Sequence, residues 1–169
     1  MNPIAREPAE ILLIDNDARA RAAATSVLES AGHVVRQTEN RAAAIKVARA
    51  EALDLMICDV NLDGQSGLDL CRELRRLPGM QDVPVMFISS SQLPDIIRRS
   101  HDAGGAYYLR KPLDPEVLID LVSKALWLPH LVQSRLAMHE PSAQPVPPPR
   151  KRAGITRASA VQGIRMPLA

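Results

Sequence analysis

Short apolar runs alternate with longer amphipathic stretches through the first three quarters of the chain. Runs typical of buried strands lie at 11–14, 34–37, 55–58, 83–88 and 107–109. Apolar residues recur at helical spacing over 18–31, 41–50, 67–77, 95–103 and 115–127. Strands that alternate with helices through short connections form a parallel sheet with helices on both faces. The pattern therefore predicts an α/β fold, a doubly wound five-stranded parallel sheet.

Short polar residues mark where several of these helices should begin. Asn40, Ser66 and Asp114 each directly precede a helical stretch, and their side chains can accept hydrogen bonds from free N–H groups of the first turn. Pro129 should end the last helix and separate it from any short helix over 130–139, because proline lacks the N–H that a helix requires. These signals predict a folded body over 9–128.

The composition changes after residue 128. Residues 129–169 contain seven of the 14 prolines, and six Lys or Arg against one Glu. No helical or alternating pattern is sustained there, so we expect a flexible Pro/Arg-rich tail, and a short flexible N-terminus over 1–8. The basic cluster 150–152 could contact nucleic acid or an acidic partner, but with only four aromatic residues in the chain we expect no nucleic-acid partner.

The sequence also indicates the cellular compartment of the protein. No apolar run approaches the roughly 18 residues of a membrane span, and residues 1–10 lack the apolar segment of a secretory signal. The two cysteines, Cys58 and Cys71, are too few for a disulfide framework or a cysteine zinc site. We expect both to be small buried hydrophobes in a cytoplasmic protein without membrane contact.

Polar residues whose side chains could take part in a reaction follow four of the predicted strands. Asp15 follows the first, Asp59 the third, Ser89 the fourth and Lys111 the fifth. The carboxyl ends of parallel strands meet at one edge of the sheet, so these side chains should converge. A carboxylate can attack phosphorus, two carboxylates suit Mg²⁺, and a lysine and a hydroxyl can stabilise phosphoryl oxygens. The set predicts a site that accepts a phosphoryl group.

Four stretches of the body carry a family resemblance. They are ILLIDND (11–17), LMICDVNLDGQSGLDL (55–70), PVMFISSS (84–91) and YYLRKPLDPEVL (107–118). In these stretches, which cover nearly all of 9–128, the chain resembles the receiver domain of two-component response regulators. The resemblance implies a flavodoxin-like fold with strand order 2-1-3-4-5.

The resemblance also implies the phosphorylation chemistry. Asp59 would accept a phosphoryl group from a histidine kinase or a phosphotransfer protein. Asp15, Asn16, Asp59 and the backbone carbonyl of Asn61 would hold Mg²⁺. The protein would be a phosphoacceptor switch with at most slow autodephosphorylation, rather than a metabolic enzyme.

The switch itself is implied in the same way. Ser89 would bond a phosphoryl oxygen, and Lys111 would pair with the phosphoryl group. Tyr108 stands at the aromatic switch position, and the family's Lys-Pro peptide bond is usually cis. A downstream protein would read the face formed by the fourth helix, fifth strand and fifth helix.

Three positions depart from the family pattern. Asn16 stands where an acidic residue usually completes the metal pair, so Mg²⁺ should bind more weakly, and Asp17 should point elsewhere. Asp63 replaces a usual proline and is either a solvated turn residue or an extra charge near the metal. Ser66 replaces an acidic residue and should cap a helix.

Three functions follow from these features. The first is a single-domain response regulator of a phosphorelay, which the residues Asp59, Ser89 and Lys111 support. The second is a phosphorylation-independent pseudo-receiver that acts as a protein interaction module, which Asn16 favours. The third, a DNA-binding regulator, rests only on the basic tail.

Overall fold

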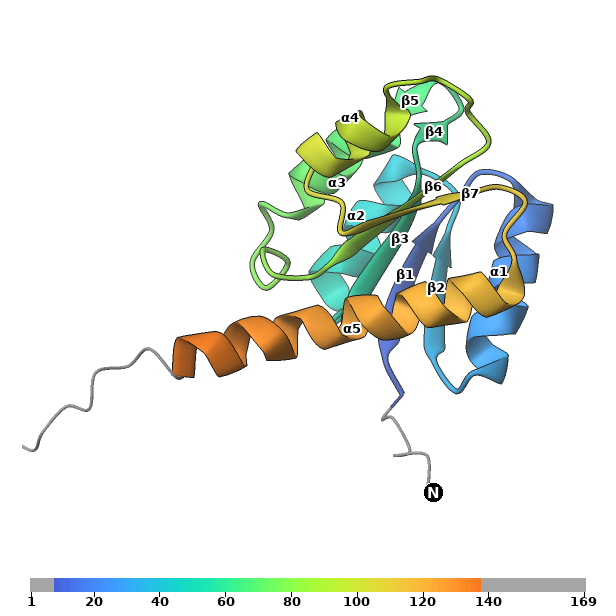
Figure 1. Cartoon of the computed structure of the whole chain (residues 1–169). Coiled ribbons are helices and arrows are strands. Elements are labelled where there is room, and N and C mark those ends of the chain that lie inside the picture. Colours follow the sequence, from blue (N-terminus) through green and yellow to red (C-terminus); the bar gives the residue numbers. More distant parts are fainter. Residues whose placement is uncertain (1–7, 138–169) are drawn as a thin grey trace, which may run out of the picture. The chain divides into compact units, whose positions relative to one another are not determined.

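The predicted parallel sheet is present in the computed structural model, which describes residues 8–137. Its strands are β1 (Glu10–Ile14), β2 (Val34–Thr38), β3 (Leu55–Asp59), β6 (Val85–Ser89) and β7 (Tyr107–Arg110). All are parallel, in the order β2-β1-β3-β6-β7 (Figure 1). Numbered by their place among these five strands, this is the expected order 2-1-3-4-5. Two further short strands, β4 (Asn61–Leu62) and β5 (Gln65–Ser66), pair as an antiparallel hairpin.

Within residues 8–137, five helices connect and cover the strands. They are α1 (Ala18–Ser30), α2 (Arg41–Ala50), α3 (Gly67–Leu74), α4 (Ile96–Asp102) and α5 (Pro115–Ala137). The expected caps are present: Asn40 Oδ1 accepts from Ala43 N at 3.0 Å, and Ser66 Oγ accepts from Asp69 N at 3.2 Å. Asp114 Oδ1 likewise accepts from two first-turn N–H groups of α5.

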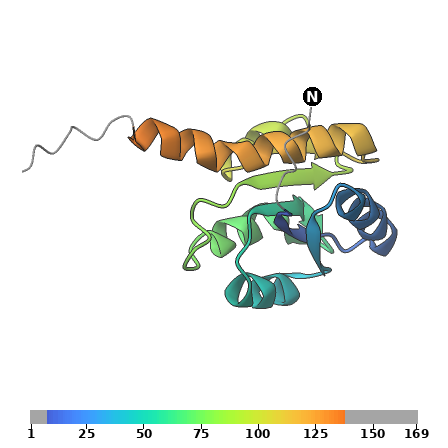
Figure 2. The ribbon, with the colours of Figure 1, turned by 90° about the horizontal axis from the view of Figure 1, so that it is seen from below.

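The sheet divides the core into two layers, one on each face. Along β1, Leu12 and Ile14 pack with α2 and α3, whereas Ile11 and Leu13 pack with α1 and α5. This alternation follows from the two-residue period of a strand. Figure 2 shows α2 and α5 on opposite sides of the sheet. Every residue of β3 and β6 is buried, which explains their uninterrupted apolar runs.

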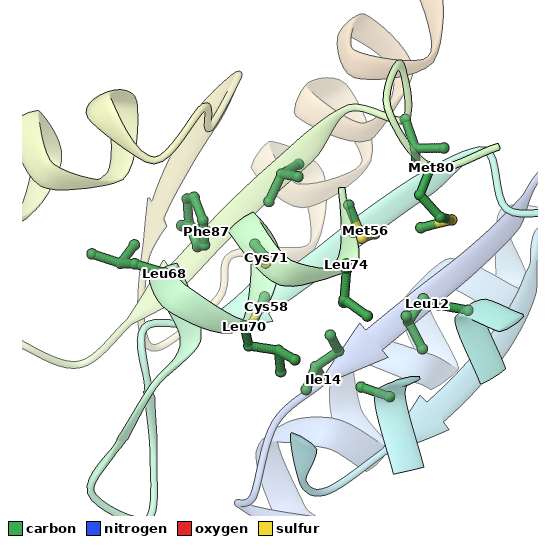
Figure 3. Close-up of a cluster of buried hydrophobic side chains, with 14 of the residues drawn as sticks. Leu12, Ile14, Met56, Cys58, Leu68, Leu70, Cys71, Leu74, Met80 and Phe87 are labelled. Atoms are coloured by element: carbon green, nitrogen blue, oxygen red, sulfur yellow. The ribbon is translucent and has the colours of Figure 1, made fainter. Parts of the chain in front are cut away.

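Both cysteines lie in the core layer under α3 (Figure 3). Cys58 and Cys71 are free and fully buried, as their apolar surroundings predicted. A hydrogen bond with Cys71, together with burial, raises the pKa of the Cys58 thiol well above its usual value. A thiol that stays protonated is a poor nucleophile, so this pair contributes packing.

The last helix is longer than the sequence pattern indicated. α5 continues to Ala137 and includes Pro129, so the prediction that Pro129 ends this helix was wrong. A proline removes one helical hydrogen bond and crowds one carbonyl, which disfavours the helix but leaves the turns on either side able to form. The tail expected from 129 therefore begins as helix, and its remainder, 138–169, lies outside the described residues, as does most of the expected N-terminal segment.

None of the described helices is both long enough and apolar enough to cross a membrane.

Candidate functional site

Three of the predicted site residues meet at the carboxyl edge of the sheet. Lys111, which follows β7, places Nζ 2.6 Å from Asp15 Oδ2 and 2.5 Å from Asp59 Oδ2. Asp15 follows β1 and is 1% exposed, and Asp59 ends β3 and is 6% exposed. Two nearly buried carboxylates thus share one ammonium group, and the predicted convergence of these three strand-end residues is confirmed.

Lys111 is held in its charged form. Burial alone would lower its pKa, but hydrogen bonds to Asp15 and Asp59 outweigh burial and raise the pKa above the usual 10.5. Counted by formal charge, the ammonium offsets one of the two carboxylates, which leaves one negative charge for the three groups. The peptide bond from Lys111 to Pro112 is cis, as the resemblance implied.

Backbone groups fix the orientation of both carboxylates. Asp15 Oδ1 accepts the N–H of Asp17 at 2.9 Å, and Asp59 Oδ1 accepts the N–H of Asn61 at 2.9 Å. Each carboxylate therefore has one oxygen held by the main chain, while its other oxygen faces Lys111. Arg21, one turn into α1, adds a further contact by donating from Nη1 to the Asp15 carbonyl at 2.5 Å.

Asn16 and Asn61 form the exposed rim of the site. Asn16 Nδ2 donates to Asp63 Oδ1 at 3.0 Å, and Asn61 Oδ1 accepts the N–H of Gly64 at 2.9 Å. Asp17 is occupied as the N-cap of α1, where its Oδ1 accepts from Arg19 N and Ala20 N. Its carboxylate is thus engaged by the helix terminus, although Asp17 also lines the cavity beside the site.

Ser89 and Tyr108, which the resemblance implies as a switch, lie on β6 and β7. Ser89 is 1% exposed, and its Oγ accepts the N–H of Ser91 at 2.9 Å. Its carbonyl accepts the N–H of Lys111 at 2.9 Å, which links the Ser89 backbone directly to the lysine. Tyr108 is half-buried against the core layer of α2 and α3, and pairs in register with Phe87.

A cavity of about 670 Å³ opens beside these residues. Its polar wall includes Asn16, Asp59, Asn61 and Lys111, while α1 and α5 supply an apolar wall. Ser90 lines this cavity and Ser89 does not. The Asp59 carboxylate is therefore buried on its protein side and open to an incoming group on the other.

The oxygen donors of the site fit Mg²⁺. Within residues 8–137, no group of three or more His, Cys, Asp or Glu side chains is placed to hold a metal on its own. Mg²⁺ needs less than that, since it commonly takes one or two carboxylates and completes its shell with water and phosphoryl oxygens. Asp15 and Asp59 supply the two carboxylates, and the Asn16 amide and the Asn61 carbonyl are neutral oxygens at the same rim.

Comparison with known proteins decides the family. The profile of the response regulator receiver domain matches residues 11–123. The chain belongs to this family. The match spans all five strands of the main sheet and the residues at their carboxyl ends, so the fold and the family agree.

Individual relatives show how widely this receiver domain recurs. It is 37% identical over 106 residues to the sensor histidine kinase AruS of Pseudomonas aeruginosa. The aligned region covers 62% of this chain and 11% of AruS. The domain is 27% identical over 118 residues to protein PilH of the same species, covering 70% of this chain and 98% of PilH. The chain thus spans a small part of its larger relatives and nearly all of PilH.

One solved relative holds a modified aspartate. A response regulator protein from Burkholderia pseudomallei was crystallised with a phosphorylated aspartic acid, calcium ion and citrate. It superposes on this receiver domain with a TM-score of 0.63 and 25% identity, covering 79% of this chain and 75% of the relative.

Two contacts of the site could not be found from the sequence. Arg21 reaches Asp15 because α1 turns back over the end of β1. Asp63 reaches Asn16 because the β4–β5 hairpin folds toward the loop after β1. The helical spacing from Asp17 to Arg21 and the Asp63-Gly64 turn pair were the available signals, and neither specifies a partner across the fold.

Proposed function

We propose that this receiver domain accepts a phosphoryl group on Asp59 from a phosphohistidine of a histidine kinase or phosphotransfer protein. The observation that carries the proposal is the joint contact of Lys111 with Asp59 and Asp15 beside an open cavity. A carboxylate with an oxygen held by the main chain is oriented for attack. The related protein with a phosphorylated aspartic acid supports the assignment.

In the proposed transfer, an Asp59 carboxylate oxygen bonds to phosphorus as the phosphorus–nitrogen bond of the donor breaks. The bonding electrons stay on the departing imidazole nitrogen. Lys111 Nζ, already charged, hydrogen-bonds the phosphoryl oxygens as it leaves the carboxylates. Asp15, Asp59, Asn16 and the Asn61 carbonyl would hold Mg²⁺, which supplies further positive charge to those oxygens.

The proposed switch runs through the backbone bond between Ser89 and Lys111. When Lys111 turns toward a phosphoryl group, the Ser89 hydroxyl can leave the Ser91 N–H and bond a phosphoryl oxygen. The segment after β6 then changes, together with Tyr108 on the neighbouring strand. Near it, Leu93 and Ile97 are 53% and 62% exposed, so an apolar surface is available for a downstream protein on the α4, β7 and α5 face.

The proposed role is that of a phosphoacceptor switch in the cytoplasm, with at most slow autodephosphorylation. Its expected partners are proteins, with neither nucleic acid nor membrane among them. The alternative function is that of a pseudo-receiver that works without phosphorylation. Asn16 favours this alternative, because an amide at this position would weaken the Mg²⁺ site.

Intact-mass spectrometry after incubation with acetyl phosphate tests the proposal. We expect a gain of one phosphoryl group with Mg²⁺ and none with EDTA. Asp59→Asn is the matched control, because it keeps the shape of the side chain and removes the nucleophilic charge. A folded wild-type protein that gains no phosphoryl group, even from a histidine kinase, would favour the pseudo-receiver.

A further inference from the structure

The site carries little net negative charge for a divalent cation, so another carboxylate nearby would strengthen it. Asp15, Asp59 and Lys111 sum to one negative charge, and the Asn16 amide is neutral. Asp17 is committed to the α1 N-cap. Asp63 is a further carboxylate in direct contact with the rim, through Asn16 Nδ2 at 3.0 Å.

We propose that Asp63 is a positioning residue of the metal site and supplies the charge that Asn16 lacks. This inference rests on the proposed Mg²⁺-dependent function. Because the Asn16 N–H donates to Asp63, the amide oxygen remains as the acceptor that can face a cation. Partners that orient a metal ligand in this way also strengthen it. The exposed Asp63 carboxylate adds a negative potential, which salt screens.

A purely local explanation of Asp63 also exists. Asp63 and Gly64 have φ values of 52° and 82° and join β4 to β5. A two-residue hairpin turn with both φ angles positive favours Asp-Gly and Asn-Gly alike. The turn therefore explains a small polar residue at 63 but does not require its charge.

Asp63→Asn separates the two explanations, because it keeps the turn chemistry and removes the charge. The measurement is the Mg²⁺ dissociation constant of the full chain by titration calorimetry, without phosphodonor. We expect roughly three- to tenfold weaker binding, less than the loss typical of fully ordered partners because Asp63 is exposed. The loss should shrink as the salt concentration rises.

Two further variants make the test specific. N16D/D63N exchanges the two side-chain types, so Mg²⁺ affinity should return to the wild-type value or exceed it. Asp82→Asn removes an exposed charge before β6, at the opposite edge of the sheet, and should leave Mg²⁺ affinity within twofold of wild type.

Equal Mg²⁺ affinity in Asp63→Asn and wild type would overturn this inference while leaving the proposed function intact. An equal loss in Asp63→Asn and Asp82→Asn would also overturn it, since the effect would then be one of overall charge. If wild type itself binds no Mg²⁺, the inference and the metal-dependent function fail together.

Discussion

Lys111→Met should slow phosphoryl transfer from acetyl phosphate by about 100- to 1,000-fold, while Mg²⁺ binds more tightly than in wild type. The first effect follows because the variant removes the positive charge that would meet the phosphoryl oxygens. The second follows because Asp15 and Asp59, each within 2.6 Å of Lys111 Nζ, lose the cation that neutralises them. Phosphorylation rates by intact mass and Mg²⁺ titration calorimetry measure the two effects separately.

The opposite directions of these effects make the Lys111 experiment informative. A variant that merely unfolds loses both transfer and metal binding. Lys124→Met is the matched control, because Lys124 pairs with Asp120 on the exposed face of α5 and should change neither quantity. Wild-type transfer in Lys111→Met would contradict the assigned role of the lysine, as would weaker Mg²⁺ binding in a folded Lys111→Met protein.

Gly67→Ala should destabilise the fold by about 3 kcal/mol and impair phosphorylation. A Cβ at Gly67 would lie 1.8 Å from the Asp59 carbonyl oxygen and 2.9 Å from its carbon. Both are backbone atoms, so either α3 or the end of β3 must move. Since Gly67 N also donates to the Val60 carbonyl at 2.8 Å, that movement breaks the connection that holds Asp59 in place.

Urea unfolding of Gly67→Ala should be compared with that of Gly79→Ala. Gly79 has a φ of 81° with open space around the missing Cβ, so alanine there costs backbone strain alone, about 1 kcal/mol. A Gly67→Ala protein as stable as Gly79→Ala, with normal phosphorylation, would show that the contact between α3 and Asp59 is not a constraint.

The sheet could be predicted because strands that are buried in the core have recognisable apolar sequences. β3 and β6 are covered on both faces, so their sequences are apolar up to the last residue of each, Asp59 and Ser89. The β4–β5 hairpin was missed, because two-residue strands carry no period. The end of α5 was misplaced, because a rule about Pro129 considers one hydrogen bond and ignores the turns around it.

The site was predictable only as far as topology determines it. Asp15, Asp59 and Lys111 follow parallel strands, so any such sheet brings them to one edge. The contacts of Arg21 and Asp63 depend on how α1 and the hairpin fold back over that edge. From the sequence, Asp63 could be either a turn residue or an extra charge near the metal. Its hydrogen bond with Asn16 makes the role as an extra charge testable.

The residue that carries the phosphoryl group can be identified chemically, which is the sharpest test of phosphorylation at Asp59. Borohydride reduction of the phosphorylated protein converts an aspartyl phosphate to homoserine, and peptide mass mapping then locates the modified residue. We expect that Asp59 alone is converted, and only in protein treated with phosphodonor and Mg²⁺. Conversion at Asp15 or Asp63 would contradict phosphorylation of the Asp59 carboxylate. A phosphoryl group retained on an unconverted Asp59 would contradict it as well.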